Sequence, residues 1–419
     1  MFDNIPLAPA DPLLDLKKAV DSDSSPHKVN LGIGIYQNDE GQIHEPYCAK
    51  EKLSFEDPGH NYTASTGIDE YLVHAAELVF GPNSETLASQ RVASVQTIAG
   101  TGAIHLGALF LRKVATTPGQ KVYVGTPTWG NHEPLFKLVA THLEKYNYYD
   151  RDERGVDLRS CLAAIRAAPE KSIFIFQVCC HNPTGADFSS PQWQLIADEM
   201  KKRNHVPMFD FAYQGLGSGE NEDAYPIRLF AAQGFEMLVC QSFSKNFGLY
   251  SERVGILHVV TRSRKAAQCT LSQLQRLIRA EFSSSPAYGA RLVNTILKDQ
   301  MLRQTWVAEL DLMRSRLQHN RLRLYESFQV LEMLCRPGHV PAKFNGRGCM
   351  IRVNVRTDKR LWKQLDEVKR KAREQLKYLE QYALDYQRSM SGIFAEQPVD
   401  GTIVITSPVL SNSRVPREC

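Results

Sequence analysis

Short apolar runs alternate with amphipathic stretches through the middle of the chain. The runs predict strands at residues 92–98, 121–125, 172–178, 206–209, 237–241 and 255–260. The stretches between them place apolar residues at helical spacing and predict helices at residues 102–112, 132–141, 158–167, 191–202 and 227–233. Because strands that alternate with helices form mostly parallel sheets covered on both faces, we expect an α/β fold.

The pattern changes after residue 261. Helical spacing dominates residues 265–334, with a break at the Ser/Pro-rich residues 283–286. A Pro-Gly break at 336–338 precedes an apolar stretch at 349–355, and a strand-like run follows at 402–405. The length of 419 residues allows one large core and a smaller second domain.

Composition and charge indicate which binding partners are not expected. The chain is 43% hydrophobic and 23% charged, its net charge is +4 and its basic residues are scattered, so we expect no nucleic-acid partner and no membrane partner. No apolar run is long enough to span a bilayer, and the N-terminus resembles neither a secretion signal nor a transit peptide. Nine cysteines without C-x-x-C spacing fit reduced thiols, and we expect a cytoplasmic protein.

The most informative segment is SFSKNFGLYSERVG at residues 242–255. Lys245 lies among small hydroxyl residues, and Arg253 follows eight positions later. A lysine that forms an imine with an aldehyde cofactor needs close backbone approach and a lowered pKa. The serines and the arginine can hold a cofactor phosphate. Alone, the motif is equally typical of a surface turn with an unrelated arginine.

Two loops after predicted strands fit the same class of cofactor. Gly100 and Thr101 open a helix, where backbone N–H groups and a hydroxyl can bind a phosphate. Trp129 in the next loop can stack on a flat heteroaromatic ring. Each has an ordinary alternative, because many helices begin with a glycine-rich turn and many half-buried tryptophans only pack.

Two further loops carry polar groups suited to such a ring. Asn182, in the segment HNPTG, can donate to a phenolic oxygen, and the proline fixes its turn. Asp210 ends an apolar run, with Tyr213 three residues later. A buried aspartate is costly without a positive partner, which a protonated pyridine nitrogen provides. An isolated aspartate here would more simply be a helix N-cap.

Together these residues resemble aspartate aminotransferases, which are pyridoxal-phosphate enzymes of fold type I. The resemblance runs from residue 1 to about 334 and includes APADP at 8–12, NLGIGIY at 30–36 and NY at 61–62. It implies a large cofactor-binding domain at residues 45–315, with a mostly parallel sheet flanked by helices. It also implies a smaller α/β domain formed by residues 1–44 and 316–419, and a homodimer.

The resemblance implies a role for each matching residue. Lys245 would form a Schiff base with pyridoxal 5′-phosphate and then move the proton at the substrate Cα. Asp210, supported by His132, would pair with the pyridine nitrogen. Asn182 and Tyr213 would bind the phenolic oxygen, and the stacking residue would be Trp129. The phosphate ligands would be Gly100, Thr101, Ser242, Arg253 and, from the neighbouring subunit, Tyr62.

The substrates follow from the same resemblance. Arg279, contributed across the dimer interface, would bind the distal carboxylate of a dicarboxylic amino acid or 2-oxo acid. Gly34, Trp129 and Asn182 would line the substrate site. The expected reaction moves an amino group between L-aspartate and 2-oxoglutarate and gives oxaloacetate and L-glutamate. Without the resemblance, Arg279 is typical of an exposed helix residue.

The match weakens beyond residue 334. Where the family carries Ser-Gly-Arg, whose arginine binds the substrate α-carboxylate, this chain has Asp400-Gly401-Thr402. Arg347 and Arg352 are near substitutes in sequence, but both are more typical of plain surface residues. A shifted register or a faulty gene prediction is a further explanation. Losing one charged bidentate contact would weaken amino-acid binding by roughly 2 kcal/mol.

Three hypotheses therefore stand at the level of sequence. The first is an aspartate aminotransferase. The second is an aminotransferase for aromatic or specialised amino acids. The third is a weakly active or non-catalytic relative that binds pyridoxal phosphate.

Overall fold

The computed structural model describes residues 22–25, 35–38, 59, 61–114, 119–334 and 370, with side chains described up to residue 323 in the last helix. The chain divides into two compact units, Met1–Glu367 and Val368–Cys419, and the helices and strands named below belong to the first. The expected domain limits at residues 45, 315 and 316 stay a prediction. The predicted strand-like stretches at 349–355 and 402–405 lie outside the described residues.

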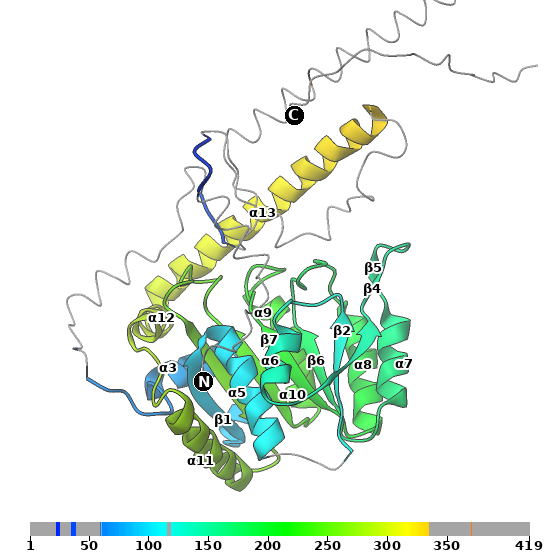
Figure 1. Ribbon diagram of the computed structural model, residues 1–419. Helices are drawn as coiled ribbons and strands as arrows, with labels where there is room; N and C mark the ends of the chain where they lie inside the picture. The colour runs from blue at the N-terminus through cyan, green and yellow to red at the C-terminus, as the bar shows by residue number, and fades with distance from the viewer. Residues whose placement is uncertain are drawn as a thin grey trace, which may run out of the picture. The chain divides into compact units, whose positions relative to one another are not determined.

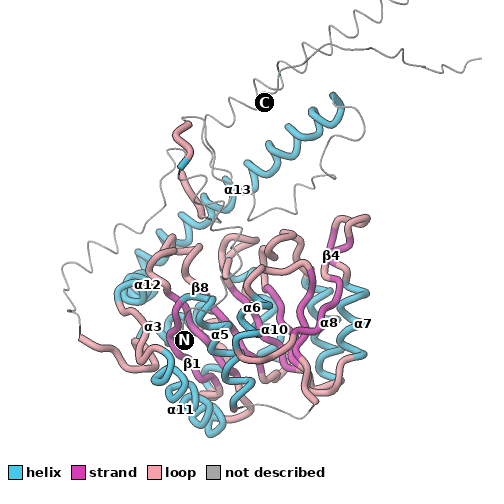
Figure 2. The backbone as a smooth tube through the Cα atoms, viewed as in Figure 1, coloured by secondary structure: helices cyan, strands magenta, loops and turns pink. Residues whose placement is uncertain are grey.

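A seven-stranded sheet forms the centre of this unit (Figures 1 and 2). Its strands, in order across the sheet, are β1 (Val92–Ile98), β9 (Val254–Val260), β8 (Met237–Ser242), β7 (Val206–Phe211), β6 (Ile173–Gln177), β2 (Val122–Thr126) and β3 (Leu143–Asn147). β9 runs antiparallel to both neighbours, and every other neighbouring pair is parallel. The predicted mostly parallel α/β sheet is confirmed.

Helices cover both faces of the sheet because its strands are apolar on both sides. On one face pack α5 (Ala99–Lys113), α6 (His132–Leu138) and α11 (Arg264–Glu281). On the other pack α3 (Asp69–Phe80), α7 (Leu158–Ala167), α8 (Ser190–Lys202) and α10 (Tyr225–Ala232). β6 shows the cause: Ile173 and Ile175 join the first core, and Phe174 and Phe176 join the second.

A third apolar cluster lies beside the segment between β8 and β9. It brings α3, α12 (Tyr288–Lys298) and the first turns of α13 (Gln300–Leu334) against Phe243 and Phe247. Both phenylalanines are at most 2% exposed. The segment that carries Lys245 is therefore packed on α3, which precedes it in sequence, and on α12 and α13, which follow it. None of the helices within the described ranges is long and apolar enough to cross a membrane.

Most predicted elements are present, with ends that differ by a few residues, but one helix ends early, one helical stretch has an additional break, and several elements were not predicted. The helix expected at 132–141 ends at Leu138, because Ala140 adopts a left-handed backbone with φ of 53° and the chain turns into β3. The helical stretch from 265 also breaks at Asp299, whose Oδ1 accepts the N–H groups of Met301 and Leu302 and so caps α13. β3 was not predicted, nor was the short pair β4 (Tyr149–Asp150) and β5 (Gly155–Val156).

Two short helices complete the described elements. They are α4 (Glu85–Ala88), between α3 and β1, and α9 (Glu220–Asp223), between β7 and α10.

Candidate active site

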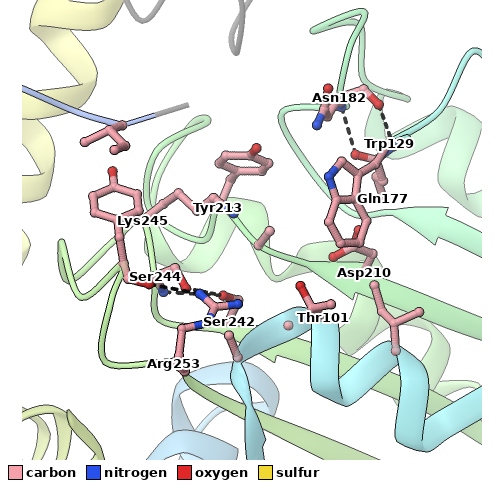
Figure 3. A pocket seen from close by; sticks show the side chains of 16 residues that line it. Thr101, Trp129, Gln177, Asn182, Asp210, Tyr213, Ser242, Ser244, Lys245 and Arg253 are labelled. Carbon is pink, nitrogen blue, oxygen red and sulfur yellow. Dashed lines mark hydrogen bonds between the residues drawn. The ribbon is translucent and has the colours of Figure 1, made fainter. Parts of the chain in front are cut away.

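A cavity of about 250 Å³ lies where the loops after four strands meet the beginning of α5 (Figure 3). Nine residues that the sequence predicts for a cofactor site line it: Gly100, Thr101, Trp129, Asn182, Asp210, Tyr213, Ser242, Lys245 and Arg253. The other lining residues are Ile35, Ala99, Ile104, Gln177, Ala212, Ser244 and Tyr250. The fold thus gathers residues that are far apart in sequence into one site.

The parallel strands explain why these side chains meet. Gln177 is the last residue of β6, and it pairs in register with Asp210 near the end of β7. Ser242 is the last residue of β8, which is parallel to β7. The carboxyl ends of parallel strands share one edge of a sheet, so residues at those ends converge there.

Asp210 is held by a buried chain of hydrogen bonds. The carboxylate is 8% exposed, and its Oδ2 lies 3.2 Å from Nε2 of His132, which is fully buried at the start of α6. Nδ1 of the same ring lies 2.8 Å from the Thr128 hydroxyl. When that hydroxyl donates to Nδ1, Nε2–H donates to the carboxylate, and the histidine is satisfied while neutral. A buried carboxylate with a neutral donor favours a cationic group as its remaining partner.

Gln177 fixes the loop that carries Asn182. Its Oε1 accepts the Asn182 N–H at 2.8 Å, and its Nε2 donates to the Asn182 carbonyl at 2.9 Å. Both backbone groups of Asn182 are thereby satisfied, and its side chain is left to face the cavity (Figure 3). Sequence reasoning missed Gln177. The available signal was its position, since Gln177 is a polar residue at the end of an apolar strand, and Asp210 lies one residue before the end of β7.

Lys245 lies in surroundings that favour its neutral amine. Burial lowers the pKa of Lys245 below its ordinary value; Asp210 opposes this shift and Arg253 adds to it. Its Nζ lies over the ring of Tyr213, 5.2 Å from the ring centroid. Burial, with a contribution from Asp210, holds the pKa of Tyr213 well above its usual range. A neutral amine can act as a nucleophile and as a base, whereas the phenol keeps its proton as a donor.

The other end of the cavity is a set of donors suited to an anion. Gly100 lies in the first turn of α5, and Ser242 Oγ accepts the Ser244 N–H at 3.3 Å. Arg253 donates from Nη1 to the Tyr250 carbonyl at 2.9 Å. Helix N-terminal N–H groups, hydroxyls and a guanidinium together bind phosphate well.

The backbone at this end of the cavity is tightly constrained. Ala99 and Arg253 both have φ of 56°, and the Ala99 N–H donates to the Arg253 carbonyl at 3.0 Å. A Cβ on Gly255 would lie 2.5 Å from the carbonyl carbon of Ala99, so only glycine permits this approach. Left-handed non-glycine residues are costly, and they persist where the surroundings fix them, often at binding sites.

Two predicted residues lie outside the described lining of this cavity. Tyr62 is 93% exposed. Arg279 is exposed on α11, and its Nη1 donates to Ser283 Oγ at 2.8 Å. Both were expected to act across a dimer interface, and that role stays a prediction. Gly34, Arg347, Arg352 and Thr402 lie outside the described residues.

Tyr250 is a further lining residue to which sequence reasoning gave no role. Its hydroxyl accepts the Tyr36 N–H at 2.9 Å, and burial raises the pKa of Tyr250 to about 12. This bond places residues 35–38 beside the cavity, with Ile35 in its wall. Tyr250 lies within the lysine segment, but nothing in the sequence shows that it contacts a segment more than 200 residues earlier.

The chain is similar to known proteins over most of its length. A family model for class I and II aminotransferases matches residues 26–373. The chain is 45% identical over 324 residues to aminotransferase tasG of Hapsidospora irregularis, covering 77% of this chain and 87% of that protein. It is 41% identical over 329 residues to an aspartate aminotransferase of Pseudomonas aeruginosa, covering 78% and 82% respectively.

Solved structures show the same likeness. One is an aspartate aminotransferase from Saccharomyces cerevisiae cytoplasm, with a TM-score of 0.79, 33% identity and coverage of 88% of this chain and 98% of that one. Another is an aromatic-amino-acid aminotransferase from Burkholderia pseudomallei covalently bound to pyridoxal phosphate, with a TM-score of 0.78, 34% identity and coverage of 89% and 98%. The chain belongs to the class I and II aminotransferases. It is an aminotransferase whose cofactor is pyridoxal phosphate.

Proposed function

We propose that this enzyme moves the amino group between L-aspartate and 2-oxoglutarate, giving oxaloacetate and L-glutamate, and that Lys245 carries the cofactor. We assign the site because Lys245, Asp210 and Arg253 line the same cavity. The choice of aspartate is supported by relatives from Pseudomonas aeruginosa and Haemophilus influenzae, which are named aspartate aminotransferases and are 41% and 40% identical.

The residues present fit the cofactor. Arg253, Ser242, Thr101 and Gly100 form the donor set suited to its phosphate, at the N-terminus of α5. At the strand ends, the buried carboxylate of Asp210 would bind the protonated ring nitrogen. When bound, the pyridinium ring supplies a sink for the electron pair released at the substrate Cα.

The remaining roles concern the ring and the reacting proton. Trp129 would stack on the ring, and Asn182 and Tyr213 would donate to its phenolic oxygen. Lys245 would remove the proton from the substrate Cα, for which its lowered pKa is suited because more of the amine is neutral at a given pH.

We further propose that the active unit is a homodimer in the cytoplasm. Tyr62 and Arg279 are exposed in the single chain, as expected of residues that would complete a neighbour's site. A relative from Dictyostelium discoideum, 40% identical over 333 residues, is named a cytoplasmic aspartate aminotransferase.

A second candidate is an aminotransferase for aromatic amino acids. Ile35, Trp129 and Tyr250 give part of the cavity an apolar and aromatic wall. A tyrosine aminotransferase of Klebsiella pneumoniae is 39% identical over 333 residues. Arg279 distinguishes the two candidate functions. A guanidinium forms a bidentate ion pair with the distal carboxylate of aspartate, and it forms no such pair with a phenyl side chain.

The test compares Arg279→Ala with Arg276→Ala, a matched arginine one turn earlier on the same helix that donates to Gln273. For a dicarboxylate enzyme, Arg279→Ala lowers kcat/KM for aspartate about 100-fold and for phenylalanine only about threefold, while Arg276→Ala changes neither. Equal losses on both substrates would contradict the proposed preference. An absorption spectrum of the loaded wild-type protein that changes with neither aspartate nor phenylalanine would contradict both candidates.

A further inference from the structure

The first turns of α13 contact the loop that carries Lys245, here called the lysine loop (residues 243–249). Trp306 is 4% exposed, and its ring stacks on Phe247 with centroids 4.6 Å apart and planes inclined by 23°. Its Nε1 donates to the Asn246 carbonyl at 2.8 Å. A buried indole thus anchors the residue next to Lys245 by both packing and a hydrogen bond.

Asn246 connects the lysine loop to the loop that carries Tyr213, here called the tyrosine loop (residues 212–217). Asn246 is 2% exposed, and its side-chain Nδ2 donates to the Gln214 carbonyl at 3.2 Å. Lys245 and Tyr213 are the immediate neighbours of these two residues in sequence. This hydrogen bond therefore helps to hold the Lys245 amine over the Tyr213 ring.

The tyrosine loop is fixed on its other sides. Arg314 of α13 donates from Nη1 to the Gly215 carbonyl at 3.1 Å. Gly215 has φ of 87°, and a Cβ there would lie 2.7 Å from Leu310 Cδ1, so this backbone lies directly against α13. The left-handed backbone favours glycine here, and a Cβ would also displace the end of the Leu310 side chain.

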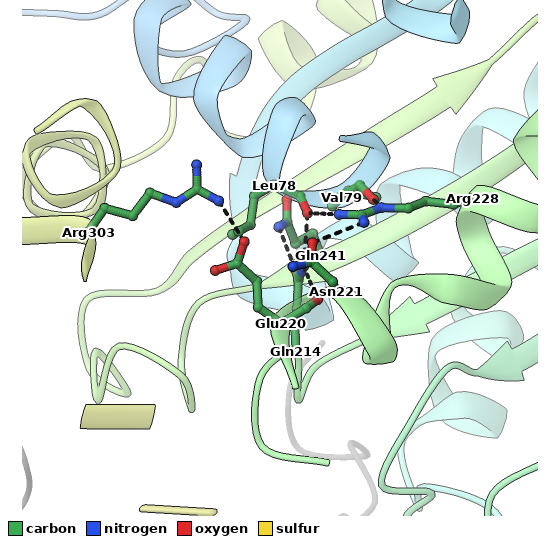
Figure 4. Close-up of polar contacts among 8 residues, drawn as sticks. All are labelled: Leu78, Val79, Gln214, Glu220, Asn221, Arg228, Gln241 and Arg303. Carbon is green, nitrogen blue, oxygen red and sulfur yellow. Dashed lines mark hydrogen bonds and ion pairs between the residues drawn. The ribbon is translucent and has the colours of Figure 1, made fainter. Parts of the chain in front are cut away.

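The Gln214 side chain is also fixed, within a buried polar network (Figure 4). Gln214 is 1% exposed and donates from Nε2 to the carbonyls of Leu78 and Glu220 at 3.0 and 3.2 Å. Gln241 donates to its Oε1 at 3.3 Å. Arg303 of α13 pairs with Glu220 at 2.6 Å. Gln214 is therefore held in place by several hydrogen bonds, and Asn246 links the lysine loop to its backbone.

We propose that Trp306 and Asn246 are positioning residues for Lys245, holding its amine in the buried place over the Tyr213 ring. This inference rests on the proposed role of Lys245 as the residue that carries the cofactor. Trp306 lies outside the described cavity lining, and Asn246 does as well, so both act through the loop backbone. Release of the lysine loop would give the amine more contact with water, and a less desolvated amine holds its proton to higher pH.

The test uses Trp306→Phe, which keeps an aromatic ring against Phe247 but removes the N–H donor together with part of the volume of the indole. The rate at which cofactor-free protein attaches pyridoxal phosphate is measured by absorbance from pH 6 to 10. We expect its pH midpoint to rise by about half a unit or more in Trp306→Phe, because the attacking amine must be neutral. In the loaded enzyme kcat falls about 10-fold while KM changes less than about twofold.

Two further variants make the result specific. Asn246→Ala removes the link to Gln214 and shifts the midpoint in the same direction. Trp193→Phe is the matched control: it changes a tryptophan of α8, 2% exposed, that packs among Phe176, Phe188, Phe209 and Phe230. It leaves the midpoint at the wild-type value.

Three outcomes are decisive. A raised midpoint in Trp306→Phe and Asn246→Ala, with none in Trp193→Phe, supports the inference. A Trp306→Phe protein that melts at lower temperature but keeps the wild-type midpoint and kcat overturns it, because the indole then only packs. A wild-type protein that attaches no cofactor at Lys245 refutes the proposed function itself, and so removes the basis of the inference.

Discussion

Individual residues of the cavity differ in how firmly their chemistry is set by their neighbours. Asp210 is held by a hydrogen bond with His132, whose ring is held in turn by Thr128. Lys245 is instead placed through its loop, with its amine over an aromatic ring. Side chains that contact Asp210 directly hold its carboxylate, whereas Lys245 is proposed to be held through its loop, which the side chains of Trp306 and Asn246 anchor.

The residue-scale prediction concerns the charge of Asp210. Asparagine has nearly the same shape and can still accept from His132, but it cannot hold a proton on a pyridine nitrogen. We expect Asp210→Asn to lower kcat/KM by roughly 100- to 1000-fold while the melting temperature stays within a few degrees of wild type. Steady-state kinetics with thermal unfolding as the control tests this. Wild-type kcat/KM in the variant would show that the carboxylate charge does not serve the reaction.

The site residues that could be predicted from the sequence and those that were missed have different roles. Lys245, Asp210 and Asn182 could be predicted because each belongs to a short motif and supplies a group that the cofactor chemistry needs. Gln177 and Tyr250 were missed because they act on other protein segments, through bonds to Asn182 and Tyr36. Such supporting contacts depend on tertiary structure, and sequence spacing carries no direct sign of them.

At the scale of elements, a buried polar chain crosses the sheet beside the site. The Ser94 hydroxyl on β1 lies 2.8 Å from Nδ1 of His258 on β9, and Nε2 of that ring lies 3.1 Å from Gln241 Oε1 on β8. Gln241 continues to Gln214 at the tyrosine loop. His258 is fully buried, and burial lowers its pKa to about 3. The folded sheet thus needs this histidine neutral.

That requirement predicts a pH dependence of stability. As pH falls below about 6.5, the unfolded chain binds a proton at residue 258 while the folded chain does not until about pH 3, so stability is complete above 6.5 and is lost progressively towards 3. His258→Gln removes this loss and can still bond to Ser94 and Gln241. Its unfolding free energy should fall less steeply with acidification, by about 1.4 kcal/mol per pH unit.

Urea unfolding at pH 7, 6, 5 and 4.5 measures the two slopes. His181 is also buried, and burial lowers its pKa to about 3, so the wild-type slope has a second contributor that the variant keeps. Identical slopes for wild type and His258→Gln would mean that His258 already takes up its proton in the folded sheet.

Among the strands, the sequence predicted those with a strong apolar pattern and missed those without one. Strand β6, with the run Ile-Phe-Ile-Phe, is buried on both faces and was unmistakable. β3 has the sequence Leu-Glu-Lys-Tyr-Asn and lies at the edge of the sheet. Partly exposed positions of an edge strand can be charged, so the apolar pattern is weaker there. The end of α6 and the break at Asp299 depend on single backbone conformations and caps, which hydrophobic spacing does not record.

At the scale of the whole molecule, the cofactor end of the site and the substrate end differ in how much one chain supplies. The predicted cofactor residues other than Tyr62 come together in one cavity of a single chain. The predicted specificity residue, Arg279, lies on the exposed face of α11. In the proposed dimer, Tyr62 and Arg279 of each chain would complete the site of the other chain. The proposed preference for aspartate depends on this arrangement.

The central claim is that the amine of Lys245 carries pyridoxal phosphate. Its most direct test is borohydride reduction of the purified, cofactor-loaded protein, followed by mass spectrometry of its peptides and a visible absorption spectrum, with Lys245→Ala beside the wild type. We predict that the cofactor is trapped on the peptide containing Lys245 and that the visible band is absent from Lys245→Ala. A colourless wild-type protein, or a cofactor trapped only on another lysine, would contradict the account.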